Sequence, residues 1–187
     1  MKPSTNNIGK TRVVTGECRA SYESLLQPKQ SLNGNMEYSC SILIPKTDKK
    51  TVADIEAAID AAKAKAKNEK WGGKIPPNCK SPMRDGDTDR PNDDAYKGHW
   101  FINAKSRNKP NVVDQDVRPI IDRTQVYSGG YFRFALSLYG YNVNGNIGVA
   151  AGLENAQKLR DGDPLGGSTS AESDFEPIKD GLEDALA

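Results

Sequence analysis

The sequence predicts a mainly β domain that contains one long helix and ends in an acidic tail. Three observations predict this fold class. Residues 131–141 alternate between apolar and polar side chains, with the period of a half-buried strand. Residues 50–68 instead repeat apolar side chains at helical spacing. Residues 168–187 are rich in acids and poor in apolar side chains, which predicts disorder.

The charge distribution divides the chain into a basic body and an acidic tail. Residues 168–187 contain six acids and one lysine, a net charge of −5, and because the whole chain carries +1, residues 1–167 carry +6. We expect one domain over residues 1–167, followed by the tail. This pattern is typical of nucleic-acid binders that screen their own groove, although a solubilising tail on a neutral enzyme also explains it.

Two strands are expected before the helix. Residues 10–22 form the first, and a loop over residues 27–35 leads to the second at residues 36–44, which ends at Pro45 because proline donates no ladder hydrogen bond. The even-numbered side chains of the second strand form its apolar face, and the opposite face carries Glu37, Ser39 and Ser41.

The helix at residues 50–68 is the strongest local signal. Thr51 and Asp54 have capping-box spacing, and Asp48 is an alternative cap. The apolar stripe comprises Val52, Ile55, Ile59 and Ala62. Lysines crowd the end of the helix, and we interpret them as a solvated face in preference to a DNA contact. These lysines are Lys63, Lys65, Lys67 and Lys70.

Residues 69–98 are irregular and hold the one acidic cluster. The spacing of Asp85, Asp87 and Asp89 resembles the start of a calcium loop, but Arg90 and Tyr96 stand where that loop needs glycine and glutamate. A solvated turn is the simplest interpretation. The alternative is a magnesium-dependent nuclease that uses these three carboxylates together with one further carboxylate, from Asp114 or Asp116.

The remaining strands are expected at residues 98–106 and in a hairpin over residues 131–159 that turns at residues 144–146. A polar connection between them holds short extended pieces at residues 112–113 and 120–121. The expected core-facing residues are Trp100, Ile102, Ala104, Phe132, Phe134, Leu136 and Leu138. The opposite faces combine aromatic and cationic side chains, as a surface that stacks bases and attracts phosphates requires.

The candidate nucleic-acid contacts follow from this assignment of faces. The first rank is Tyr131, Arg133, Tyr139, Phe101 and Lys105, and the second rank is Arg107, Tyr141, Lys158 and Trp71. Aromatic rings stack on any base, and lysine and arginine bind phosphates. A register shift of one residue would turn each of these strand residues into the core.

Motifs for cofactor chemistry are absent from the sequence. Cys18, Cys40 and Cys79 form no CxxC pair and His99 is the single histidine, so we expect free thiols, no metal and no cofactor. No Walker A or GxGxxG pattern occurs. Without a signal peptide or a long apolar run, the expected location is the cytoplasm.

Three separated blocks resemble the phage single-stranded-DNA-binding proteins of the OB-fold type. They are GHWFINAK at 98–105, YSGG at 127–130, and the segment that runs from GVAAGL at 148–153 to QKLRDG at 157–162. The resemblance covers residues 8 to about 175 and includes the acidic tail. One departure is the end of the chain, which is Ala185-Leu186-Ala187 where related proteins often end on an aromatic residue, so that Phe175 is the only aromatic of the tail.

The resemblance implies a five-stranded Greek-key barrel with one inserted helix. It also implies sequence-independent binding of single-stranded DNA in phage replication, recombination or repair, inside an infected bacterial host. The acidic tail would then occupy the DNA groove and dock a polymerase or helicase. A structural phage protein that uses the sheet for assembly is the remaining alternative.

Overall fold

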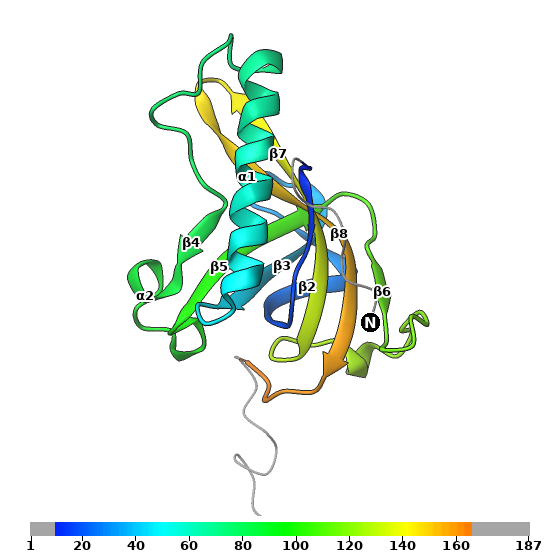
Figure 1. Ribbon diagram of the computed structural model, residues 1–187. Helices are drawn as coiled ribbons and strands as arrows, with labels where there is room; N and C mark the ends of the chain where they lie inside the picture. Colours follow the sequence, from blue (N-terminus) through cyan, green and yellow to red (C-terminus); the bar gives the residue numbers. More distant parts are fainter. Residues whose placement is uncertain (1–9, 166–187) are drawn as a thin grey trace, which may run out of the picture.

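The computed structural model describes residues 10–165, and its strands form one closed sheet (Figure 1). Five strands make a barrel in the order β2, β3, β5, β8 and β7, and β7 pairs back to β2. Only the β5–β8 contact is parallel within this barrel. Its strands are β2 (Cys18–Gln30), β3 (Met36–Pro45), β5 (His99–Ser106), β7 (Tyr131–Val143) and β8 (Asn146–Arg160). This is the OB-fold barrel, so the predicted fold class is confirmed.

Shorter elements extend the barrel. They are β1 (Arg12–Val14) beside β7, β4 (Met83–Asp85) beside β5, β6 (Asn111–Val113) beside β8, helices α1 (Lys49–Glu69) and α2 (Gly86–Asp89), and 3₁₀ turns at Asp94–Tyr96 and Arg123–Gln125. The four-residue helix α2 and strand β4 lie in the region that the sequence left irregular. Within residues 10–165, neither α1 nor α2 is long and apolar enough to cross a membrane.

The N-terminal strand was predicted incorrectly in its extent. Residues 10–22 are divided between β1 and β2, and β2 continues to Gln30, through the first four residues of the expected loop. The break occurs at Gly16, whose amide donates to Thr51 Oγ1 at 2.9 Å. A Cβ at Gly16 would lie 2.7 Å from Asp48 Oδ2, so the start of α1 packs against this bend and separates the two strands.

Helix α1 begins and ends within one residue of the predicted range. Asp48 is the cap, since its carboxylate accepts a hydrogen bond from the Thr51 amide at 3.1 Å. Ile55 and Ile59 on the predicted stripe are buried in the same core as the barrel strands. The helix therefore packs across the barrel with one face, and its C-terminal part continues past it beside the β7–β8 hairpin (Figure 1).

The β7–β8 hairpin has the predicted register. Its inward side chains Phe132, Phe134, Leu136 and Leu138 are at most 2% exposed. Asn144 and Gly145 form the turn with φ of 52° and 83°, the left-handed conformation that a two-residue hairpin turn needs. The hairpin extends beyond the barrel because β7 pairs with β8 over its whole length.

The faces of β3 and β5 follow the predicted alternation except at one end. Ile42, Ile102 and Ala104 are in the core as expected. Met36 is 56% exposed although the alternation placed it on the apolar face, while Glu37 is only 9% exposed. This end of β3 pairs with the last residues of β2, in a hairpin that has left the core.

Candidate nucleic-acid interface

The outer surface of the barrel brings polar residues of four strands into register. Ser39 on β3 pairs with Lys105 on β5, and Lys105 pairs with Gly152 on β8. Gly152 in turn pairs with Ser137 on β7. Side chains two residues apart on a strand share a face, so Tyr139 lies next to Ser137 on this outer surface. We call this band, together with the adjoining bulge of β2, the outer face.

Tyr139 stands at one end of the outer face and is 41% exposed. Its ring edge lies beside Gly152, where a Cβ would be 3.7 Å from Tyr139 Cε1. The ammonium of Lys70, just after α1, lies 5.9 Å from the ring centroid. Partial burial raises the pKa of the Tyr139 hydroxyl, and the nearby Glu37 carboxylate raises it further, so the phenol stays neutral. An uncharged ring beside a lysine suits a base and its phosphate.

Tyr22 stands at the other end and is 58% exposed. It lies at a bulge in β2, where the pairing with β3 shifts between Ser21 and Ser24. Its φ of 45° is left-handed, which is uncommon for a residue of this size. The bulge turns the ring outward, where the guanidinium of Arg90 lies 5.3 Å from its centroid.

A groove of about 280 Å³ joins Tyr22 to Lys105. Its floor is polar, and the hydroxyl of Tyr96 bridges Ser41 Oγ at 2.9 Å and Ser21 Oγ at 3.2 Å. Lys105 lies 3.9 Å from Glu37, and its side chain remains 53% exposed. The groove is lined by Tyr22, Lys29, Glu37, Ser39, Ser41, Arg90, Tyr96, Asn103 and Lys105, with parts of Cys40 and Ala104.

Phe101 does not lie on an open face, contrary to the prediction. It points away from the main core as the alternation required, but it is 1% exposed. Tyr96 covers it in an edge-to-face contact with ring centroids 5.0 Å apart, and Leu43 completes a second small core. The segment between β4 and β5 supplies this cover, which the strand pattern alone does not reveal.

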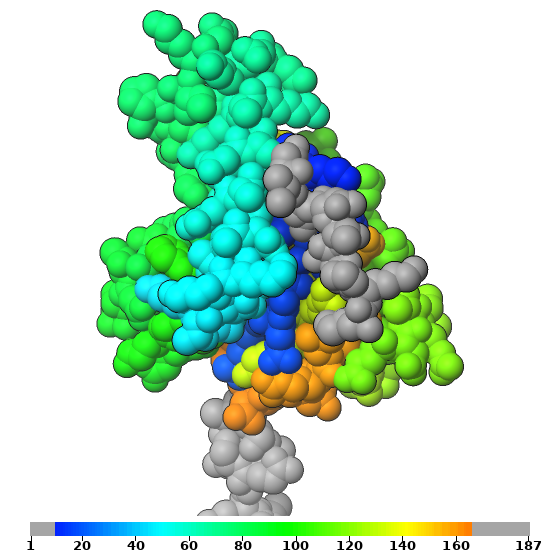
Figure 2. All heavy atoms as spheres, viewed as in Figure 1, coloured from blue at the N-terminus to red at the C-terminus, as the bar shows by residue number. Residues whose placement is uncertain are grey.

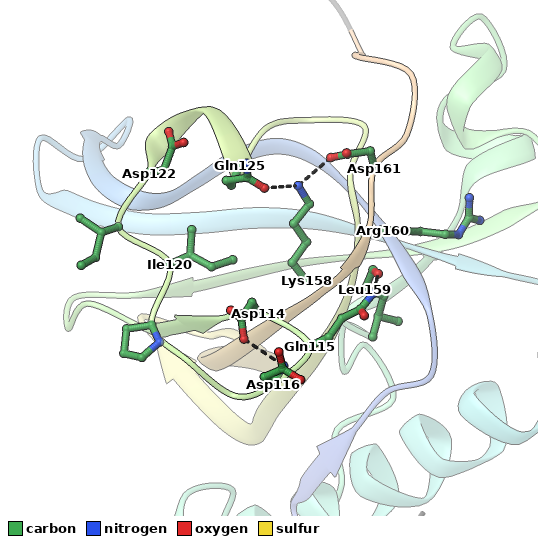
Figure 3. Close-up of a pocket in the computed structure, with 12 residues that line it drawn as sticks. Asp114, Gln115, Asp116, Ile120, Asp122, Gln125, Lys158, Leu159, Arg160 and Asp161 are labelled. Atoms are coloured by element: carbon green, nitrogen blue, oxygen red, sulfur yellow. Dashed lines mark hydrogen bonds and ion pairs between the residues drawn. The ribbon is translucent and has the colours of Figure 1, made fainter.

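Trp71 and Lys158 are also enclosed. Trp71 is 8% exposed, packs beside Gly140 and donates its indole hydrogen to the Tyr141 carbonyl at 3.2 Å. The Lys158 side chain is 10% exposed, and its ammonium lies 2.6 Å from Asp161 Oδ1. Figure 3 shows Lys158 pointing to Gln125 and Asp161 in a pocket with several carboxylates. Neither residue is available as an open contact.

Tyr131 and Arg133 lie toward the opposite end of β7. The Arg160 guanidinium is 3.7 Å from the Tyr131 ring centroid, and that of Arg19 is 5.6 Å away. Arg133 Nε donates to the Thr15 carbonyl at 3.1 Å. Eight residues of strand separate Tyr131 from Tyr139, about 27 Å at strand rise, so these two tyrosines do not form one platform.

Tyr141 and Arg107 border the outer face. Tyr141 is half-buried and lies on the same side of β7 as Tyr139. Its hydroxyl oxygen is 2.7 Å from the position that a Cβ of Gly148 would occupy. Arg107 is exposed and follows directly after β5. The first-rank residues that the structure brings to this face are thus Tyr139 and Lys105.

The acidic cluster required by the nuclease alternative is an ion-pair network. Lys46 Nζ lies 2.7 Å from both Asp85 Oδ1 and Asp87 Oδ2. Asp89 pairs with Arg84 at 2.8 Å. Hydrogen bonds from Lys46 lower the pKa of Asp85 and of Asp87. In the part of the chain that the structure describes, no three ligating side chains gather as a metal site.

Asp114, the further carboxylate considered for that nuclease, has a local role. Its Oδ1 accepts hydrogen bonds from the amides of Asp116 and Arg118, both at 2.9 Å, in the turn after β6. Asp114 therefore stabilises a turn. It follows β6, which pairs with β8, whereas Asp85 ends β4, which pairs with β5.

Sequence reasoning missed Tyr22, Arg90 and Lys29. Tyr22 was expected at the end of a strand, and Arg90 was considered only as a misfit in a calcium loop. They meet because the segment after β4 folds over β3 and β5. The one sequence signal that could have indicated Tyr22 as a contact was a tyrosine with no assigned role, next to the polar residues Glu23 and Ser24.

Comparison with known proteins agrees with this architecture. A profile of the family described as "Enterobacter phage Enc34, ssDNA-binding protein" matches residues 11–186. Protein p50 of Acyrthosiphon pisum secondary endosymbiont phage 1 is 30% identical over 198 residues, covering 100% of this chain and 98% of its own. The two proteins therefore correspond over nearly their whole lengths.

Two solved structures share the fold. The single-stranded DNA-binding protein of bacteriophage Enc34, in complex with ssDNA, superposes with a TM-score of 0.70 at 24% identity, over 83% of this chain and 90% of that one. The bacteriophage T7 single-stranded DNA binding protein gp2.5 gives a TM-score of 0.62 at 18% identity, over 88% and 94%. With the profile match over most of its length, this chain belongs to the Enc34 single-stranded-DNA-binding protein family of phages.

Proposed function

We propose that this protein binds single-stranded DNA without sequence preference and acts in phage DNA replication, recombination or repair in the cytoplasm of the infected bacterium. One observation carries the proposal. Tyr22 and Tyr139 are the two exposed aromatic residues of the described range, and both lie on the outer face. Family membership supports the same conclusion, and the structure of the Enc34 protein is that of its complex with ssDNA.

The mechanism follows from the chemistry of this face. A single strand exposes its bases, and the rings of Tyr22 and Tyr139 offer flat surfaces on which any base can stack. Lys29 and Lys105 stand between them and neutralise phosphates, which releases counterions and makes affinity fall as salt rises. Gly152 lacks a side chain beside Tyr139, which leaves room for Ser137 Oγ, 2.7 Å from the position of an added Cβ.

Glu37 limits how strongly this face attracts phosphate. Its carboxylate lies 3.9 Å from Lys105 Nζ and faces the same groove. The pair leaves the centre of the groove nearly neutral, so stacking contributes a large share of the affinity there. Serine and asparagine side chains on the floor can bond to any base edge, which is consistent with binding without sequence readout.

The predictions for the acidic tail concern residues outside the described range, and they form part of the proposal. We assign the DNA-binding domain to residues 1–167 and a regulatory tail to residues 168–187. The six acids of the tail give it phosphate-like charge, by which it competes with DNA for the basic surface of the domain. Once DNA displaces it, the tail is free to bind a polymerase or a helicase. Phe175 is its one aromatic residue.

A fluorescence-anisotropy titration tests the function directly. We expect labelled single-stranded DNA to bind more tightly than a duplex of the same length, because stacking needs unpaired bases. The labelled strand should stay intact when magnesium is added. Equal affinity for the two forms would contradict the proposal, and the absence of any binding at low salt would favour an assembly surface instead.

A further inference from the structure

A basic projection extends from the barrel beside the outer face. It consists of residues 61–80, which are the C-terminal half of α1 and the chain after it, together with the β7–β8 hairpin tip at residues 142–148. We call it the lysine arm. Figure 1 shows α1 and the hairpin leaving the barrel together, and Figure 2 shows the helix and the following chain standing clear of the body.

The arm holds the whole charge excess of the described chain. Residues 61–80 contain six lysines and one glutamate, a net charge of +5, and residues 142–148 contain no charged side chain. Residues 10–165 carry 24 of the 26 lysines and arginines and 19 of the 25 acids, because Lys2, Lys179 and the six tail acids lie outside, and their net charge is also +5. The rest of the described chain is therefore neutral.

The arm lysines have no carboxylate partners within residues 10–165. The ion pairs of that range lie on the barrel, its loops and the first turns of α1. Lys70 donates to the Gly140 carbonyl and Lys80 to Asn146 Oδ1, both at 2.7 Å. Lys65, Lys67 and Lys74 are exposed, and their ammonium groups make no hydrogen bond to a described residue. Positive charge concentrated without compensation attracts a polyanion.

The arm is held to the hairpin at several points. Trp71 is buried against Gly140, and its ring atom Cζ2 is 3.0 Å from the position that a Cβ of Gly140 would occupy. Lys80 forms a β-bridge with Gly148, and the Lys80 amide donates a hydrogen bond of 3.1 Å to the Ile147 carbonyl. Trp71 is the one aromatic residue of the arm, and it is enclosed. The arm therefore offers cations in a fixed arrangement and no exposed ring, which suits phosphates but not bases.

The arm adjoins the outer face at Tyr139. A crevice of about 200 Å³ between α1 and β7 is lined by Lys65, Lys70 and Tyr139 together. When a single strand of DNA stacks a base on Tyr139, its next phosphates therefore lie close to the first lysines of the arm. We propose that the lysine arm is a phosphate-binding continuation of the DNA path, occupied by the same single strand after it leaves Tyr139. This inference rests on the proposed function and extends its site.

The test compares oligothymidylates of two lengths with the full chain. The lengths are about 6 nucleotides, within the site size of about 4–16 nucleotides of one OB-fold, and about 30 nucleotides, which exceeds it. The arm variant is K65Q/K67Q/K74Q. The matched control is K49Q/K97Q/R118Q, which removes the same charge from exposed positions away from the outer face. Dissociation constants are measured at salt concentrations from about 0.05 to about 0.5 M, because phosphate contacts make the affinity depend on salt in this range.

We expect the arm variant to lose affinity for the long strand alone. Three lost phosphate contacts reduce the slope of log K against log salt by about 2, since each contributes about 0.7. The short strand and the control should keep their slopes. Equal loss for both lengths, or a long-strand slope unchanged from the parent protein, would overturn the arm inference while leaving the outer face intact. A parent protein that binds no single strand would overturn both.

Discussion

The guanidinium of Arg90 lies 5.3 Å from the ring centroid of Tyr22 and donates a hydrogen bond of 3.0 Å to its hydroxyl. Arg90 is itself fixed, since it lies 4.6 Å from the Tyr96 ring centroid and pairs with Asp93 at 3.1 Å. An exposed ring at an unfavourable backbone angle is thereby held in one orientation. Fixing a ring before binding reduces the entropy that binding must overcome.

Tyr22→Ala should weaken binding of single-stranded DNA by about 1–3 kcal/mol, the usual loss when a stacking ring is removed. Tyr22→Phe keeps the ring and should retain most of the affinity. Anisotropy titrations with labelled oligothymidylate measure both, and denaturant unfolding confirms that the fold is retained. Parent-like affinity of Tyr22→Ala would remove this end of the outer face from the site.

Tyr139→Ala and Tyr131→Ala form a matched pair on one strand. Tyr139 is 41% exposed, so its loss should cost about 1–3 kcal/mol of binding. Tyr131 is already stacked by Arg160 at 3.7 Å, so its loss should instead lower the free energy of unfolding, by about 1–2 kcal/mol, and change binding little. The two variants are compared by titration and by urea unfolding. The reverse ranking in binding would place the site at the Tyr131 end of β7.

The barrel could be predicted because local patterns and global packing agree in it. The alternation around Phe134 and the Asn144–Gly145 turn fix the hairpin, and the stripe through Ile55 fixes α1. The first strand could not be divided correctly, because the bend at Gly16 exists only where α1 packs against it. That contact joins residues far apart in the sequence.

The site was less predictable than the fold, because strand alternation shows which way a side chain points but not what covers it. Phe101 points outward as predicted, yet Tyr96 from a distant loop encloses it. Tyr22 is exposed through a bulge, for which a single sequence carries no clear signal. The lysines after Ala62 were read as a solvated face, since only the structure places Lys70 beside Tyr139.

Lys46→Gln should destabilise the protein at neutral pH, and the difference should shrink in acid. Lys46 lowers the pKa of Asp85 and of Asp87, so its contribution is present above the unfolded carboxyl pKa of about 4 and is lost as pH falls through the lower folded values. The pKa of Lys46 is raised, so its own charge persists through this range.

The measurement for Lys46→Gln is the unfolding midpoint of both proteins, followed from neutral pH into the acid range in which the two carboxylates take up protons. Because solvent reaches this ion pair and screens it, we expect a small difference in stability near neutrality. A difference that stays constant down to the lowest pH would show that Lys46 acts through its packing over Trp100, from whose ring centroid its ammonium lies 4.9 Å away.

The acidic tail can reach the outer face from where the described chain ends. Leu165 is anchored by a hydrogen bond of 2.8 Å to the Ser128 carbonyl, near the end of β8 that is remote from the lysine arm. From Leu165 to Tyr139 the path follows most of β8, about 45 Å at strand rise. The 22 residues after Leu165 span up to about 75 Å when extended. Length therefore permits the tail to compete with DNA along the whole path.

Truncation after Gly167 should raise the affinity for single-stranded DNA, because it removes a tethered charge of −5 from a body of +6. The gain should be about tenfold at 0.01 M salt, where the screening length is about 30 Å, and small at 0.15 M, where it is about 8 Å. A full-length variant with the six tail acids changed to their amides separates charge from length. It should match the truncated protein if charge competition is the cause. Parent-like affinity of both proteins at the lower salt would show that the tail does not occupy the DNA path.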